Sequence, residues 1–210
     1  MVTWVRGSSK NVEGEIEFDP RRPEELAVES TIDARACWTG GPTRDDHLRS
    51  ADLLHCEAYP SIRFASTKVA KIGPTDFDVA GDLTIRSVTL PVLLAVRYLG
   101  TWQTPWWEDG VDKGPKERAG FTGTTSIDRY DFGVDWNGAL PNGRIVVGRR
   151  IDIVLDVEGI RYNDLRVCLK NVKGTKACVH PLSAMMVSMT RFVSCGSRTW
   201  MQTAPASRAG

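Results

Sequence analysis

Several side chains that could take part in catalysis lie between residues 45 and 56, namely Asp45, Asp46, His47, His55 and Cys56. A cysteine with a neighbouring histidine can supply a nucleophile and its base, and two histidines with a carboxylate can bind a metal ion. The two histidines are eight residues apart, however, and the sequence contains no HExxH or CxxC motif. We therefore expect a polar helix with solvated charges, and we keep a hydrolase that uses the Asp45/His47 region as the weaker alternative.

Two pairs of carboxylates could also support acid–base chemistry: Asp76 with Asp78, and Asp128 with Asp131. Each pair lies where a predicted strand meets a turn, and carboxylates at such places commonly cap backbone N–H groups or contact water. The sequence contains no glycine-rich phosphate-binding loop. We therefore expect no catalytic residues, no bound metal and no cofactor.

The elements that hold these residues are predicted to be mainly strands. The stretch from Phe77 to Gly100 is predicted as two antiparallel strands joined by a turn. Pro91 fits an edge, a bulge or a strand start because it lacks a backbone N–H, and Gly81 indicates a bulge or a sharp bend. Alternate residues of a strand point to the same face. The second strand therefore has one apolar face, formed by Val88, Leu90, Val92, Leu94, Val96 and Tyr98.

Further strands are predicted around residues 15–18, 26–36, 62–64, 119–129 and 145–157, where apolar and polar residues alternate. In the last of these segments, Arg149 is the one charged residue on the apolar face. The turns between the segments are rich in Gly, Pro and Asn. About seven short strands with such turns are typical of an antiparallel sandwich or barrel.

Two segments depart from this strand pattern. Residues 43–56 have helical spacing, with Thr43, Asp45 and Asp46 as candidate N-caps, and predict a short helix that covers one end of the barrel. Residues 102–118 contain three of the seven tryptophans together with Pro, Gly and acidic residues. We predict a loop there, whose tryptophans either pack it against the barrel or cover the barrel opening.

Three segments carry a family resemblance: GDLTIRSVTLPVLLAV at 81–96, TRDDHLRSADLLHCEAYPSIRFAST at 43–67 and SIDRYDFGVDWNGAL at 126–140. In this order they resemble the YceI-like family, whose members are lipocalin-like barrels that bind polyisoprenoids and other long amphiphiles. The resemblance spans roughly residues 6–158 and implies an all-β, antiparallel lipocalin-like β-barrel with one short cap helix. Similar proteins usually begin with a strand that this sequence does not show. We therefore expect either that the barrel lacks its first strand or that an alternative start was chosen, and in the first case residues 184–193 are the candidate replacement.

The predicted inward faces carry large apolar side chains, which either fill the barrel as an ordinary core or line a cavity for one ligand. The residues alone leave both possibilities open. The resemblance favours a cavity that holds a long isoprenoid or fatty chain for storage or transport, in a bacterial protein that is not an enzyme. The apolar ligand-binding candidates are Phe64, Leu83, Ile85, Val92, Leu94, Val96, Phe121, Ile127, Phe132 and Trp136.

Cationic side chains at the barrel mouth would select the head group of such a ligand. The candidates are Arg44, His47, Arg49 and Arg86, which suit a diphosphate or a quinone oxygen. The expected partner is thus an isoprenoid lipid or an isoprenoid quinone. The alternative is a packed barrel with a structural or interaction role, for example in a stress response, and the sequence leaves open whether the chain forms a homodimer.

The composition argues against other classes of protein. The 27 Lys and Arg residues nearly balance the 26 Asp and Glu residues, so we expect no nucleic-acid partner. The sequence has no apolar run that could span a membrane and no secretory signal. We expect a cytoplasmic protein, or a periplasmic or secreted one if the true start lies upstream. Five cysteines without a CxxC motif indicate free thiols.

We place a domain boundary after residue 162. Residues 1–162 form the predicted lipid-binding barrel. Residues 163–210 are basic, lack a sustained helical or strand period, and are predicted to be an atypical C-terminal tail that is partly disordered. Cys168, Cys178 and His180 lie in this tail, where we expect a chance cluster rather than a metal site.

Overall fold

The computed structural model describes residues 2–9, 11–19, 21–138, 147–163, 166–169, 188–189 and 194–197. Its one α-helix within these ranges is α1 (Pro42–Arg49), and 3-10 turns occupy Pro23–Glu25 and Ala34–Ala36. The strands are β1 (Val2–Val5), β2 (Ser8–Ser9), β3 (Val12–Glu17), β4 (Ala27–Asp33), β5 (Cys37–Trp38), β6 (Ser61–Lys71), β7 (Asp76–Ile85), β8 (Val88–Thr104), β9 (Trp107–Glu108), β10 (Val111–Asp112), β11 (Lys116–Asp128), β12 (Arg150–Asn163), β13 (Arg166–Leu169), β14 (Ser188–Met189) and β15 (Ser194–Ser197).

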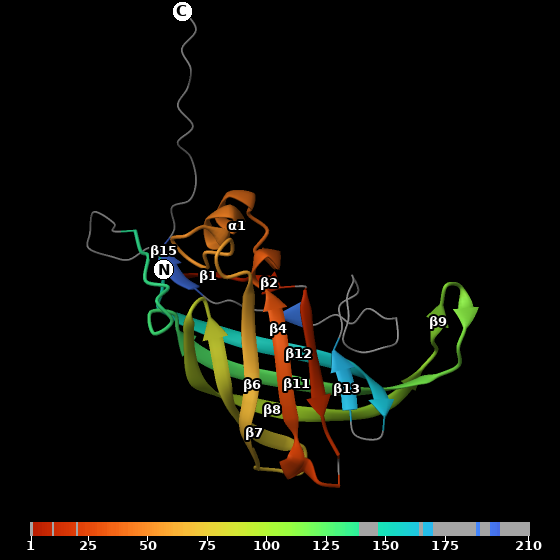
Figure 1. The fold of residues 1–210 in the computed structure, drawn as a ribbon. Helices are drawn as coiled ribbons and strands as arrows, with labels where there is room; N and C mark the ends of the chain where they lie inside the picture. The colour runs from red at the N-terminus through yellow and green to blue at the C-terminus, as the bar shows by residue number, and fades with distance from the viewer. Residues whose placement is uncertain are drawn as a thin grey trace, which may run out of the picture.

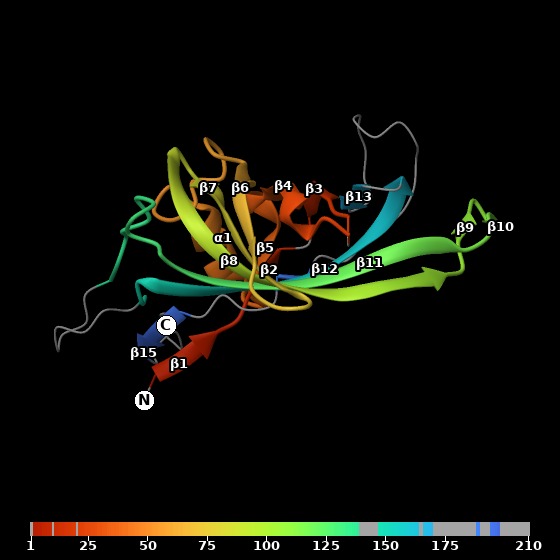
Figure 2. The same ribbon diagram turned by 90° about the horizontal axis from the view of Figure 1, so that it is seen from below.

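The main sheet curls round into a barrel (Figure 1). Its strands lie in the order β11-β8-β7-β6-β4-β3-β13-β12-β14, and β11 also pairs with β12, so the hydrogen-bonded ladder returns to its start. We call the end of the barrel that α1 covers the cap end. The β7–β8 turn and the C-terminal end of β11 also lie at the cap end. We call the opposite end the arm end, because β8 and β11 continue there as a two-stranded arm to the β9–β10 hairpin (Figure 2).

The hairpin predicted between Phe77 and Gly100 is present as β7 and β8. The two strands pair from Asp76↔Arg97 to Ile85↔Val88, and Arg86 adopts a positive φ of 55° in the tight turn. Along the barrel part of β8 the predicted apolar face is buried or half-buried, whereas its neighbours, such as Leu93 at 55% exposure, face outward. The alternating pattern therefore correctly predicts which face of β8 packs against the core.

The sequence predicts a bulge or a bend at Gly81, and the β6–β7 ladder has an irregular register at this position. The register shift lies opposite it, in β6, between Ser66 and Lys68. A Cβ atom at Gly81 would lie 2.4 Å from Cζ of Phe64 and 2.5 Å from the carbonyl oxygen of Ala65. Glycine is required because the aromatic ring of Phe64 lies directly over the backbone of β7.

The loop predicted for residues 102–118 is shorter than expected. β8 runs to Thr104 and β11 begins at Lys116, so residues 102–104 and 116–118 of the predicted loop belong to strands. The tryptophans also differ from one another. Trp106 is buried, with the guanidinium carbon of Arg118 5.8 Å from its ring centroid, whereas Trp107 is 59% exposed on the arm.

Four aromatic side chains fill the barrel towards its arm end. Phe18 contacts Tyr98, Phe121 and Phe77 with ring-centroid separations of 4.7, 5.4 and 6.1 Å. Tyr98 and Phe121 are 5.3 Å apart. These rings belong to one core cluster that continues to the cap end, where it includes Leu53, Phe132 and Val134.

The position between β3 and β12 is filled by a segment that the sequence did not predict. We expected residues 184–193 to replace a missing first strand. Of these, the structure describes residues 188 and 189, and they pair with Leu155 and Asp156 of β12. It is β13 that pairs with both β3 and β12 and so completes the ladder.

Candidate functional site

The barrel wall opens between β8 and β11 near the cap end. The two strands are paired from Lys116↔Thr104 to Thr124↔Ala95, and the pairing stops there. Beyond this point residues 88–94 of β8 remain paired with β7, and residues 125–128 of β11 remain paired with β12. The two strands therefore diverge, each held by its other neighbour. Pro91 lies on the free edge of β8, as expected for a residue without a backbone N–H.

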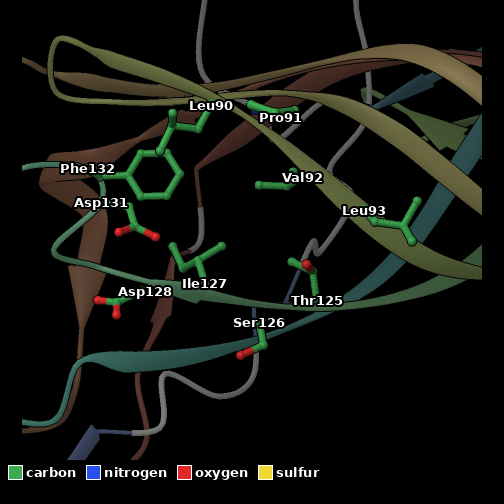
Figure 3. A pocket seen from close by; sticks show the side chains of 10 residues that line it. All are labelled: Leu90, Pro91, Val92, Leu93, Thr125, Ser126, Ile127, Asp128, Asp131 and Phe132. Atoms are coloured by element: carbon green, nitrogen blue, oxygen red, sulfur yellow. The ribbon is translucent and has the colours of Figure 1, made fainter.

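A pocket of about 400 Å³ occupies this gap (Figure 3). Figure 3 shows the side chains of Val92 and Ile127 pointing into the space between the strands, while the ring of Phe132 lies beside Leu90. These four residues also pack in the main core cluster, so the pocket borders the barrel interior. The residues that line it are Leu90, Pro91, Val92, Leu93, Thr125, Ser126, Ile127, Asp128, Asp131 and Phe132.

The predicted interior residues all belong to the core cluster. Val92, Val96 and Trp136 are half-buried members, and the others are buried. Val92, Ile127 and Phe132 are the members that also line the pocket. The remaining seven positions pack the barrel: Phe64, Leu83, Ile85, Leu94, Val96, Phe121 and Trp136. A ligand contact at any of these ten residues stays a prediction.

The four head-group candidates lie at the cap end, and none of them lines the pocket. The guanidinium of Arg44 donates to the side chain and the carbonyl of Thr39, at 2.6 and 2.9 Å. Arg49 donates to Asp46 at 2.7 Å and to the carbonyl of Cys37 at 3.2 Å.

The other two candidates also have protein partners. Nε2 of His47 lies 3.2 Å from a carboxylate oxygen of Asp52, and its ring meets that of Trp136 edge-on at 4.3 Å. Arg86 donates to the carbonyl of Gly133 at 2.7 Å. These contacts fasten α1 and the loop after β11 to the barrel, and a head-group contact at any of the four residues stays a prediction.

The reactive residues predicted near α1 are engaged in the fold. Asp45 is buried and accepts hydrogen bonds from the backbone N–H and the hydroxyl of Thr39, at 2.9 and 2.5 Å. The N-cap of α1 is Gly41, with Pro42 at the first helical position, rather than Thr43, Asp45 or Asp46.

The thiols near α1 are poor nucleophiles. Cys37 and Cys56 are free and buried. Burial raises the pKa of the Cys56 thiol to about 11 and also raises the pKa of Cys37. Because the thiolate is the reactive form, neither thiol is activated at neutral pH.

Two carboxylates stand at the rim of the pocket. Asp128 accepts the backbone N–H of Tyr130 at 2.9 Å and forms an ion pair of 2.6 Å with Arg149. These contacts lower the pKa of Asp128, the hydrogen bond from Tyr130 most strongly. Arg149 was predicted to face inward, but it precedes β12 and is 56% exposed. Asp131 is exposed nearby, so the rim of the pocket carries two carboxylates together with Arg149, which pairs with Asp128.

Sequence reasoning missed the residue that shapes the loop beside the pocket. Arg129 is buried, and its guanidinium donates to the carbonyls of Val134, Trp136, Val147 and Gly148 at 2.5–3.2 Å. Burial lowers the pKa of this arginine. Arg129 lies in the SIDRYDFG segment that carries the family resemblance, and this position was the only feature of the sequence that could have indicated its importance.

In the described part of the chain, no group of three or more His, Cys, Asp or Glu side chains is placed to hold a metal ion. The predicted chance cluster of Cys168, Cys178 and His180 lies outside the residues whose side chains the structure describes. Among the helices of the described ranges, none is long and apolar enough to cross a bilayer.

Comparison with known sequences gives consistent matches. A family model described as the YceI-like domain matches residues 1–159. A UPF0312 protein of Pseudomonas putida is 31% identical over 159 residues, which cover 76% of this chain and 75% of that protein. A UPF0312 protein of Ectopseudomonas mendocina is 34% identical over 161 residues, with 76% of each chain covered.

Solved structures show the same fold. A YceI protein of Campylobacter jejuni has a TM-score of 0.63 at 26% identity, covering 78% of this chain and 88% of its own. BcnA of Burkholderia cenocepacia has a TM-score of 0.57 at 20% identity, covering 74% and 94%. The predicted all-β, lipocalin-like barrel with one short cap helix is confirmed.

Proposed function

Because the chain belongs to the YceI-like family and has an apolar pocket in its barrel wall, we propose that it binds a long-chain lipophile, an isoprenoid or a similar lipid. The protein holds this ligand for storage or transport and performs no chemistry on it.

The observation that carries this proposal is the position and composition of the pocket. Its volume of about 400 Å³ is within the range of small-molecule sites, and its inner side is formed by Leu90, Val92, Ile127 and Phe132. Each CH₂ group moved from water into such surroundings contributes ~0.8 kcal/mol. An apolar chain of modest length therefore gains enough to bind without a strong polar contact.

The rim of the pocket favours a head group without negative charge. Asp128 and Asp131 stand there, whereas Arg44, His47, Arg49 and Arg86 lie elsewhere at the cap end. A diphosphate would meet the exposed carboxylate of Asp131 at the rim, which is unfavourable. Of the two head groups considered from the sequence, the structure therefore favours the uncharged quinone over the diphosphate, and an isoprenoid alcohol fits equally well.

Catalysis receives no support from the reactive residues near α1. Asp45 is held by Thr39, and burial keeps the thiol of Cys56 protonated. These side chains anchor the cap rather than face the pocket.

Titration with retinol tests the proposal, because retinol is a fluorescent isoprenoid alcohol. We expect saturable binding to the purified full-length chain, and weaker binding of retinoic acid, which has the same chain with an anionic head. Val92→Thr should weaken retinol binding several-fold, because it adds a hydroxyl to the pocket wall at nearly constant shape. Val69→Thr is the matched control, since Val69 is also half-buried against the core but does not line the pocket.

The competing hypothesis is a packed barrel with a structural role. The aromatic cluster at the arm end favours this hypothesis. A chain that binds neither retinol nor retinoic acid would support that hypothesis. Equal effects of the two valine substitutions would show that retinol does not bind in this pocket.

A further inference from the structure

We propose that the ligand enters and leaves the barrel sideways, through the gap between β8 and β11, and not through either end of the barrel. This inference rests on the proposed lipid binding and adds the route to the site. The two ends of the barrel are closed by side chains, whereas its wall is open between β8 and β11.

The cap end is closed by packed side chains. Leu48 and Leu54 of the α1 region and Trp136 pack on the core, and Leu53 is buried in it. The cap is also fastened from outside, since Arg86 donates to the carbonyl of Gly133. A ligand entering here would have to lift the cap and break these contacts together.

The arm end is closed by the aromatic cluster. Phe18, Phe77, Tyr98 and Phe121 lie with their ring centroids 4.7–6.1 Å apart, in contact geometry. Phe77 and Phe121 are almost completely buried. Passage through this end would require several large rings to move at once.

The gap between β8 and β11 needs no such rearrangement. The ladder between the two strands already ends at Ala95 and Thr124, so no interstrand hydrogen bond between them has to break beyond that pair. Val92 and Ile127 line the pocket and also belong to the core cluster, so the pocket lies directly against the barrel interior. A ligand that enters here meets these two aliphatic side chains and not a layer of aromatic rings.

The outer lip of the gap is suited to an apolar chain rather than to a peptide strand. Leu93 is 55% exposed and Pro91 is exposed beside it, so the lip offers apolar surface to a lipid. A peptide that added to the free edge of β8 would lack a hydrogen bond at Pro91, which has no N–H to donate.

A reversible cross-link across the gap tests the route. The pair Leu93→Cys and Ser126→Cys lies on the outer lip, one residue on each strand, and a disulfide-containing bifunctional thiol reagent would join them. The pair Ala95→Cys and Thr124→Cys is the matched control, because these exposed residues face each other where the strands are already paired. Cys168, Cys178 and Cys195 are replaced by Ser in both variants, whereas Cys37 and Cys56 are buried and are kept.

Retinol uptake and release are then followed by stopped-flow fluorescence. We expect the cross-linked lip pair to take up and release retinol more slowly by roughly tenfold or more. Reduction of the reagent should restore both rates, which also shows that the variant is folded. The control pair should keep its rates in both states.

The outcomes separate the route from the function. Unchanged rates in the cross-linked lip pair, with retinol still bound, would overturn the lateral route and leave the proposed function intact. Equal slowing in both pairs would also overturn it, since the effect would then come from stiffening of the barrel. A chain without cross-links that takes up no retinol would overturn both proposals.

Discussion

At the scale of residues, buried Arg129 determines the shape of the loop beside the pocket. Its guanidinium donates to the carbonyls of Val134, Trp136, Val147 and Gly148. Five fixed donors in a plane can serve several carbonyls at once, which a lysine ammonium cannot do. The loop that carries Phe132 to the pocket therefore depends on one side chain.

Replacement of this arginine by lysine should be costly. We expect Arg129→Lys to lower the free energy of unfolding by about 2–3 kcal/mol, because buried carbonyls lose their donors. Urea denaturation measures the change. Arg149→Lys is the control and should change the free energy of unfolding far less, since Arg149 is an exposed ion-pair partner. Similar costs for the two variants would contradict the role assigned to Arg129.

Asp19 should make the fold sensitive to acid. Its carboxylate is buried and accepts hydrogen bonds from the backbone and the side chain of Arg21. These hydrogen bonds lower the pKa of Asp19 from 3.8 to about 2, and the charges of Arg21 and Arg22 add a smaller effect. The charged form thus stabilises the folded state at neutral pH, and this contribution is lost as the pH falls from about 4 to about 2. Wild type should melt higher than Asp19→Asn at pH 6, and the difference should shrink over that range. Asp82→Asn, at an exposed position, should show no such convergence.

The sequence predicted individual residues unevenly. Residues on regular strands could be assigned correctly, because alternation alone determines that Leu83, Leu94 and Phe121 point inward. Partners across the fold could not be predicted. Arg86 was predicted as a head-group candidate, and its hydrogen bond to the carbonyl of Gly133, 47 residues away, could not be foreseen from the sequence. The type of a residue shows which contacts it can make. Which of these contacts it does make depends on the tertiary structure.

At the scale of elements, the β6–β7 pair is constrained by close contact at Gly81. A Cβ atom there would overlap Cζ of Phe64 and the carbonyl of Ala65. We expect Gly81→Ala to lower the free energy of unfolding by about 2 kcal/mol, because the ring and the strand have to move apart. Thermal and urea unfolding would measure it.

Gly123→Ala provides the matched control for this substitution. It is also a buried strand glycine, but the nearest atom to its added Cβ is Cδ1 of Leu155 at 3.4 Å. This substitution should stay within about 1 kcal/mol of wild type. If both alanine variants are equally stable, the close approach at Gly81 does not constrain the barrel.

The β7–β8 hairpin was predictable because its two strands are adjacent in sequence and alternate regularly. The gap between β8 and β11 was not predictable. These two strands share no local sequence pattern, and where their pairing stops depends on the tertiary structure. Pro91 gave a partial signal for a free edge. The tryptophan-rich arm was misread as a loop because Pro105, Gly110 and Gly114 interrupt its pattern.

At the scale of the whole molecule, the family resemblance found in the sequence is confirmed. The barrel needs β13, a strand near the C-terminal part of the chain, to complete its hydrogen-bonded ladder. β13 pairs with β3 on one side and with β12 on the other. The domain boundary placed after residue 162 stays a prediction, and β13 lies beyond it.

Hydrogen exchange on shortened chains tests that boundary. A chain that ends at residue 163 lacks β13, so the amides of β3 that face it lose their partners and should exchange faster. A chain that ends at residue 169 keeps β13 and should protect β3 as the full chain does. Equal protection of β3 in both shortened chains would instead support an independent barrel of residues 1–162.

The central claim is that the barrel carries a lipophile. The most direct measurement is extraction of the purified full-length protein with organic solvent under denaturing conditions, followed by mass spectrometry of the extract. We predict a stoichiometric isoprenoid or similar lipid with an uncharged head group, in line with the apolar pocket and its acidic rim. A folded, monodisperse protein that yields no lipid, and that takes up no added polyprenol or isoprenoid quinone, would contradict the account.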